Sequence, residues 1–143
     1  MQLVTRKIST RSTRIYTAIT GVLLLLQGIS TLAFRLYPPL DKAFPQLLGI
    51  TRMILPHSIL HILTGIAALA ILFWGGERGT FWFATGFGLF YTGLALFGYI
   101  THHPTIFGLQ PFDQPFHLFI GAWGLFVAGL SIYSSNIFSK NKQ

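Results

Sequence analysis

The chain of 143 residues contains no cysteine and only three acidic residues, and charged residues make up 9% of it. The absence of cysteine excludes disulfides, thiolate metal sites and cysteine nucleophiles. A soluble domain carries about 25% charged residues, so this chain has too few charges to cover a surface that faces water. Its 52% of apolar residues instead indicate that hydrocarbon surrounds most of the protein.

The few charges are mostly basic and lie outside the long apolar segments. Ten Lys and Arg against three acids give a net charge of +7. Basic chains often bind nucleic acid, but here four bases lie in the N-terminal arm of residues 1–14 and two in the C-terminal tail of residues 135–143. This placement is typical of topology signals and of contacts with lipid headgroups. We therefore expect the lipid bilayer as a partner, and no nucleic acid.

Four apolar segments are each close to the length that crosses a membrane as a helix. They cover residues 15–36, 54–74, 80–100 and 116–134, and about 20 helical residues span ~30 Å of hydrocarbon. Backbone groups in lipid must hydrogen-bond within the protein, which favours helices. The sequence predicts an all-α fold, in which residues 1–143 form one transmembrane domain, a four-helix bundle.

The distribution of Lys and Arg predicts the orientation. The short turn of residues 75–79 makes the second and third segments antiparallel neighbours. Seven of the ten bases lie in the N-terminal arm, this turn and the tail, and three lie on the opposite side. The positive-inside rule then places both termini in the cytoplasm or its equivalent. We expect a multi-pass protein of a bacterial inner membrane or a thylakoid membrane.

A short motif near the start of the second segment recurs near the start of the fourth. His61-x-x-x-Gly65 and His117-x-x-x-Gly121 share it, which predicts two helical hairpins in a parallel repeat. Small residues at a spacing of three or four predict faces where helices approach closely in lipid. The expected helix-packing positions are Gly65, Gly88, Gly93, Gly121 and Gly124.

All five histidines lie towards the non-cytoplasmic side. His57 and His61 are four residues apart, as are Asp113 and His117, so each pair shares one helix face. If the second and fourth helices pack together, these four residues converge and offer ligands suited to Zn, Fe or Cu. His61 and His117 are, in another interpretation, ligands of a haem or a chlorophyll.

Structural roles compete with these interpretations. Asp113, two residues before Pro115, is typical of a helix N-cap. His61 and His117 lie only ~6 Å below their helix starts, where a hydrogen bond to a neighbouring helix or a proton-sensing role also accounts for a histidine. His102 and His103 are expected in water.

Catalytic motifs are missing from the sequence. It holds no Gly-rich phosphate loop, Walker lysine or nucleophile elbow, and an enzyme acting on a lipid-borne substrate would have only the His/Asp pair in its favour. Our leading prediction is a non-enzymatic accessory or structural subunit of a membrane complex. The alternative is a protein that binds a metal, haem or chlorophyll within a photosynthetic or respiratory complex.

Residues 55–130 carry three motifs that together resemble a known family. These are His57-x-x-x-His61-x-x-x-Gly65, Tyr91-Thr-Gly93-Leu94 and Asp113-x-x-x-His117-x-x-x-Gly121. The chain resembles the bacterial family described as domain of unknown function forty-three eighty-three, although Ser58 and Gln114 stand where family members often carry Asn. The resemblance implies four membrane spans and no assigned activity. Its members occur in cyanobacteria and actinobacteria, which implies a place beside a photosynthetic or respiratory complex.

Overall fold

The computed structural model describes residues 11–43, 53–103, 107–109 and 111–140, and in these residues all regular structure is helical. Four long helices dominate: α1 (Arg11–Leu36), α4 (Leu55–Trp74), α5 (Gly76–Thr101) and α6 (Asp113–Lys140). A short helix, α2 (Pro38–Ala43), follows α1. All four long helices are long and apolar enough to cross a membrane. The predicted all-α fold is confirmed, and the chain is a small multi-pass membrane protein.

The helices begin and end where local chemistry permits. Pro56 lies in the first turn of α4, where its missing N–H would have had no partner within the helix. His102 ends α5 in the left-handed conformation, with φ 54°, and its N–H donates to the Gly98 carbonyl over 3.0 Å. These local signals fix the ends of both helices on the side where the histidines lie.

The connection between α4 and α5 is shorter than the five-residue turn that the sequence predicts. Only Gly75 separates the two helices, and Gly76 already opens α5 with φ +59°, a conformation that glycine adopts without strain. Glu77 lies in the first turn of α5, where a carboxylate interacts favourably with the helix dipole. Gly76 and Glu77 thus extend α5 beyond the apolar segment that the sequence predicts.

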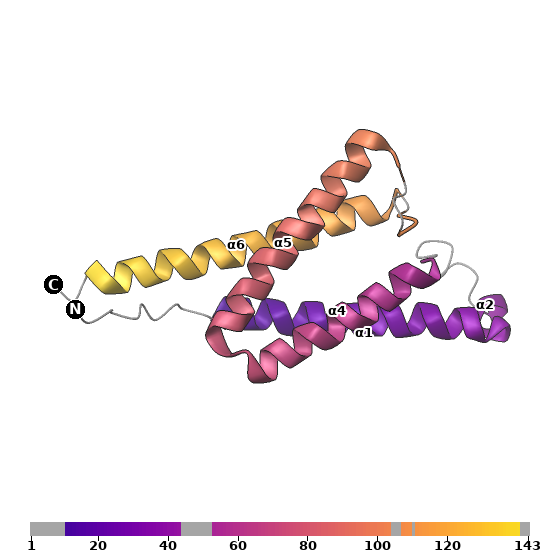
Figure 1. The fold of residues 1–143 in the computed structure, drawn as a ribbon, viewed down its shortest axis with the longest axis horizontal. Coiled ribbons are helices and arrows are strands. Elements are labelled where there is room, and N and C mark those ends of the chain that lie inside the picture. The colour runs from indigo at the N-terminus through magenta and orange to yellow at the C-terminus, as the bar shows by residue number, and fades with distance from the viewer. Residues whose placement is uncertain (1–10, 44–52, 104–106, 110, 141–143) are drawn as a thin grey trace.

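The helices pack as two pairs, α1 with α4 and α5 with α6. Figure 1 shows α4 and α5 diverging from the turn that joins them, while α4 and α6 both begin at the end of the molecule opposite the start of α1. The pairs meet through α1 and also between α4 and α5. The Tyr16 hydroxyl of α1 donates to the Ile120 carbonyl of α6 over 3.0 Å. The Oγ1 atoms of Thr13 and Thr80 lie 3.4 Å apart where α1 and α5 begin.

Glycines allow the close approach within each pair. A Cβ atom on Gly65 would lie 2.7 Å from the Leu25 backbone nitrogen of α1, and one on Gly121 would lie 2.6 Å from the Thr92 nitrogen of α5. Gly88 and Gly124 have similarly close neighbours. Contrary to expectation, Gly93 is exposed and has no atom within 4 Å of a built Cβ, because it lies five residues after Gly88 and so on another face of α5.

Candidate functional site

The first two turns of α4 bring two histidine rings together inside the protein. His57 is 2% exposed and His61 is 1% exposed, because their spacing of four residues turns both rings towards the interior. Their Nε2 atoms lie 3.1 Å apart. Neutral imidazole carries one donor and one acceptor nitrogen, so one ring donates to the other.

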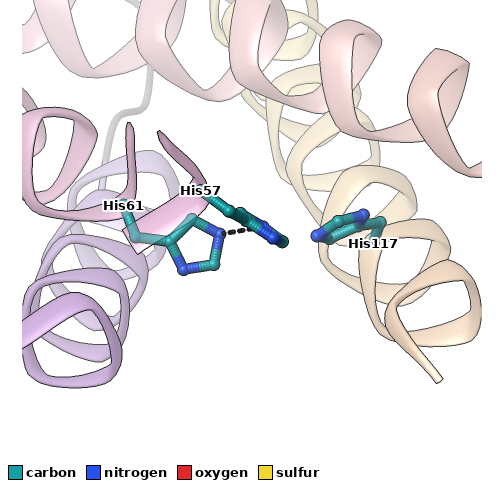
Figure 2. A group of neighbouring side chains, drawn as sticks. All are labelled: His57, His61 and His117. Atoms are coloured by element: carbon teal, nitrogen blue, oxygen red, sulfur yellow. Dashed lines mark hydrogen bonds between the residues drawn. The ribbon is translucent and has the colours of Figure 1, made fainter. Parts of the chain in front are cut away.

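His117 approaches this pair from a different helix. It lies in the second turn of α6 and is 2% exposed, and its ring centroid is 6.0 Å from that of His57. One ring nitrogen from each of the three histidines lies within 4.8 Å of the others. Figure 2 shows His57 between His61 and His117, with the three rings turned towards one another. The structure thus brings together three of the four residues that the sequence predicts as metal ligands.

Each of the three rings keeps a buried nitrogen that no described residue satisfies. The Nδ1 atoms of His57, His61 and His117 are buried and have no hydrogen-bond partner among the described residues. A buried polar atom without a partner loses the hydrogen bonds of water without replacement. Three such atoms on neighbouring rings therefore call for partners beyond the described residues, such as ordered water.

Asp113, the fourth predicted ligand, occupies a different place. It is 8% exposed and is the first residue of α6, one turn before His117. It does not belong to the group of ligand atoms that lie within 4.8 Å of one another in the described residues. Its carboxylate lies at the positive end of the helix dipole, so its position on α6 has an electrostatic explanation that needs no metal.

His102 and His103, the remaining two histidines, are exposed at the end of α5. Their side chains lie on the surface and not in the buried cluster. The sequence placed all five histidines towards one end, and the structure separates them by burial into three interior rings and two surface rings.

Tyr91 is the residue at this site to which the sequence assigned no role. It lies on α5 and is 2% exposed, and its hydroxyl is 3.2 Å from the His61 Nε2. Its ring also meets the ring of His117 with centroids 4.6 Å apart and planes at 76°. The spacing of Phe83, Phe87 and Tyr91 by four residues was the available signal, because it places Tyr91 on the interior face of α5.

The fold and these residues define an all-helical, multi-pass membrane protein with a buried cluster of histidines between its helix pairs. The chain belongs to the family of the Domain of unknown function (DUF4383), whose model matches residues 14–133. The resemblance predicted from three short motifs is therefore confirmed, and the match extends beyond them. No curated protein and no solved structure matches the chain significantly.

Proposed function

We propose that this membrane protein binds one late first-row transition-metal ion through His57, His61 and His117, and that the ion joins its two helix pairs. The observation that carries this proposal is the convergence of the three buried rings, whose ligand atoms lie within 4.8 Å of one another. Two rings come from α4 and one from α6, so an ion between them would connect the α1–α4 pair to the α5–α6 pair.

The chemistry of the donor set suits such an ion. Imidazole is a preferred ligand of Zn, Cu, Fe and Ni, whereas Ca and Mg prefer oxygen. With Zn–N bonds of ~2.0–2.1 Å, two nitrogens on a tetrahedral ion lie about 3.3 Å apart. The 3.1 Å between the Nε2 atoms of His57 and His61 is already close to this value. Small changes in side-chain torsion would bring His117 into place.

The burial of the rings favours a structural ion over a catalytic one. All three are at most 2% exposed, so a substrate would reach an ion between them only through the protein, although three protein ligands leave the fourth position of a tetrahedral ion to a water molecule. The rings also contact one another through His57, which suits a single ion better than the macrocycle of a haem or chlorophyll. The proposal therefore keeps the non-enzymatic function predicted from the sequence.

A link at this end matters because α4 and α6 make no extended contact within the described residues. In Figure 1 the two helices begin near each other and then separate. Their side chains meet chiefly through the histidine rings, for example His57 and His117. An ion held by both helices would replace the missing contact with three coordinate bonds.

A parallel repeat of the two hairpins would account for the location of the site. His61 and His117 each stand four residues before a glycine that packs against the partner helix, Gly65 and Gly121. Gly65 packs on Gly21, and Gly121 packs on Gly88. Gly21 and Gly88 are 67 residues apart in the sequence. Thr13 and Thr80, which contact each other, have the same separation. Equivalent residues that touch are what a two-fold relation between hairpins produces. The histidines would then lie between the two copies.

Metal analysis of the protein purified in mild detergent tests the proposed function. The protein is stripped with a chelator, offered Zn²⁺, Co²⁺ or Cu²⁺, separated from free ion and analysed for bound metal and thermal stability. We expect one ion per chain and a raised unfolding temperature. His103→Ala serves as a matched control, since His103 is exposed at the same end. Folded protein that takes up no stoichiometric ion would overturn the proposal.

The role as an accessory subunit stays a prediction. Its support is the small size of the chain and the exposed aromatic surface of α6, where Phe119 and Phe126 are 68% and 63% exposed. Purification in mild detergent addresses it as well. Co-purification of a stoichiometric membrane subunit would support the prediction, and a lone monodisperse monomer would count against it.

A further inference from the structure

The Nε2 atom of His61 has two close polar neighbours, and only one of them is a histidine nitrogen. The Nε2 of His57 lies 3.1 Å away and the hydroxyl oxygen of Tyr91 lies 3.2 Å away. A neutral imidazole nitrogen carries either one hydrogen or one lone pair, so it can make a full hydrogen bond with only one of these neighbours. Hydrogen bonding by His61 therefore does not account for both close approaches.

The two distances match those between neighbouring ligands of one ion. Ligand atoms that lie ~2.0–2.1 Å from a tetrahedral metal are about 3.3 Å apart. A hydrogen bond that orients a ligating histidine uses the nitrogen that does not bind the metal. In His61 the Tyr91 hydroxyl contacts the Nε2, which also faces His57, and the Nδ1 has no partner among the described residues. The hydroxyl thus lies where a ligand would lie.

Packing fixes the Tyr91 ring in this position on α5. The ring is 4.0 Å from that of Phe87, centroid to centroid, and Phe87 stacks on Phe83 at 5.1 Å. Its other side meets the ring of His117 edge to face, with centroids 4.6 Å apart. A ligand on a helix whose side chain is held by packing needs little rearrangement to bind.

An oxygen ligand that becomes anionic also suits the charge of the site. Three neutral imidazoles leave both positive charges of a divalent ion uncompensated, and burying an uncompensated charge is costly. The rings of His57, His61 and His117 are at most 2% exposed, and so is Tyr91. A phenolate among these ligands would halve the net charge that the protein has to bury.

We propose that the hydroxyl oxygen of Tyr91 is the fourth protein ligand of this metal ion and takes the position that a water molecule would otherwise hold. On binding, the O–H bond breaks, the oxygen–metal bond forms and the proton passes to the surrounding buffer, with no change of oxidation state. The proposal rests on the proposed metal binding by the three histidines. It adds a ligand from α5, so the ion would join three helices.

The substitution Tyr91→Phe removes the oxygen and keeps the ring with its packing on Phe87. The matched control is Tyr16→Phe. Tyr16 is 0% exposed and its hydroxyl also makes a buried interhelical hydrogen bond, but to the Ile120 carbonyl and not to a histidine. The two substitutions remove the same group from buried positions, and only Tyr91→Phe removes an atom that contacts the histidine cluster.

Cu²⁺ is the probe, because a phenolate bound to Cu²⁺ gives a charge-transfer absorption, and resonance Raman excitation within it shows the ring vibrations of the phenolate. Imidazole ligands alone give no such vibrations. We expect these lines in the unaltered protein and in Tyr16→Phe, and their loss in Tyr91→Phe. Competition with a chelator should show that Tyr91→Phe binds Cu²⁺ about 100-fold more weakly or worse, since even partners outside the ligand shell contribute about 10–100-fold.

The outcomes separate this proposal from the proposed function. If the unaltered protein takes up no stoichiometric ion, the proposed function fails and Tyr91 has no ion to bind. If it takes up Cu²⁺ without phenolate lines, the histidine site stands and the fourth ligand is overturned, whether or not Tyr91→Phe folds. Phenolate lines that persist in folded Tyr91→Phe would also overturn it.

A Tyr91→Phe protein that does not fold leaves the assignment to the other variant. The chain has five tyrosines, and Tyr37, Tyr99 and Tyr133 are exposed by 59%, 43% and 65%, so they lie outside the buried cluster. Phenolate lines that Tyr16→Phe retains would then support Tyr91 as the ligand, and their loss in Tyr16→Phe would overturn the assignment.

Discussion

The rings of His57 and His117 lie with centroids 6.0 Å apart and planes at 60°, although the two residues belong to helices that make no extended contact within the described residues. Edge contacts between rings contribute only about 0.5–1.5 kcal/mol. The helix pairs also meet through α1 and between α4 and α5, but at this end the rings are a weak link between α4 and α6. An ion shared by these rings would contribute far more, so the histidines of α4 and α6 offer the most direct test of what joins the pairs.

His117→Ala should remove most of the stabilisation that a metal gives. His117 is the only member of the cluster on α6, so its loss leaves both remaining ligands on α4 and breaks the link between the pairs. An ion present at 100 times its dissociation constant stabilises a folded protein by about 2.7 kcal/mol. We expect this gain in the unaltered protein and little of it in the variant, as measured by thermal unfolding with and without Zn²⁺.

Exposed His103 supplies the control for that experiment. His103→Ala removes an imidazole from the same end of the molecule but not from the buried cluster. Its Zn²⁺-dependent gain should equal that of the unaltered protein. Loss of the gain in His103→Ala, with the gain kept in His117→Ala, would show that surface histidines, and not the buried cluster, hold the ion.

The parts of this site that depend on a single helix could be predicted from the sequence. The spacing of His57 and His61 guarantees a shared face on any helix, and the apolar segments guarantee the helices. The contact of His117 with His57 and His61 depends on the angle at which the two helix pairs cross. The periodicity of a single helix carries no information on that angle. Tyr91 illustrates the same limit, because its contacts with His61 and His117 join three helices.

The helix ends in the structure differ from the ends of the predicted apolar segments for a local reason. Hydropathy marks where a segment leaves the hydrocarbon and not where its backbone hydrogen bonds end. Gly76 and Glu77 therefore read as a turn, yet they form the first turn of α5. Gly93 shows a related effect: its residue type favours a packing position, but its place on the helix circumference turns it outward.

Gly121→Ala should destabilise the protein, and Gly93→Ala should not. A Cβ on Gly121 would lie 2.5 Å from the Thr92 Oγ1 and 2.6 Å from its backbone nitrogen, so α5 and α6 would have to separate. Overpacking of this kind costs about 1–3 kcal/mol. Gly93 is on the same helix pair and has open space around it. Unfolding of both variants in the same detergent provides the measurement, and equal stability would contradict the proposed importance of close approach at Gly121.

The hydroxyl pair of Thr31 and Ser58 should contribute a small coupling between α1 and α4. Their oxygens lie 3.0 Å apart and both are buried. Thr31 also donates to the Gln27 carbonyl, and Ser58 has the Ile54 carbonyl within 3.5 Å, so neither hydroxyl is left without a partner when the other is removed. Interhelical hydrogen bonds in membranes average about 0.6 kcal/mol in double-mutant cycles. We expect that value from the cycle of Thr31→Val and Ser58→Ala, and a coupling above ~2 kcal/mol would contradict this account.

The predicted orientation can be tested with introduced cysteines, because the chain has none of its own. Glu77 and His103 are both exposed and lie at opposite ends of α5. Replacing Glu77 leaves every Lys and Arg in place, and acidic residues contribute little to orientation, so Glu77→Cys reports the topology without disturbing it. With both termini in the cytoplasm, a membrane-impermeant maleimide should label His103→Cys in intact bacterial cells and Glu77→Cys only after the membrane is opened. The reverse pattern would place the histidine cluster at the cytoplasmic end, where an ion would be drawn from the cytoplasmic pool.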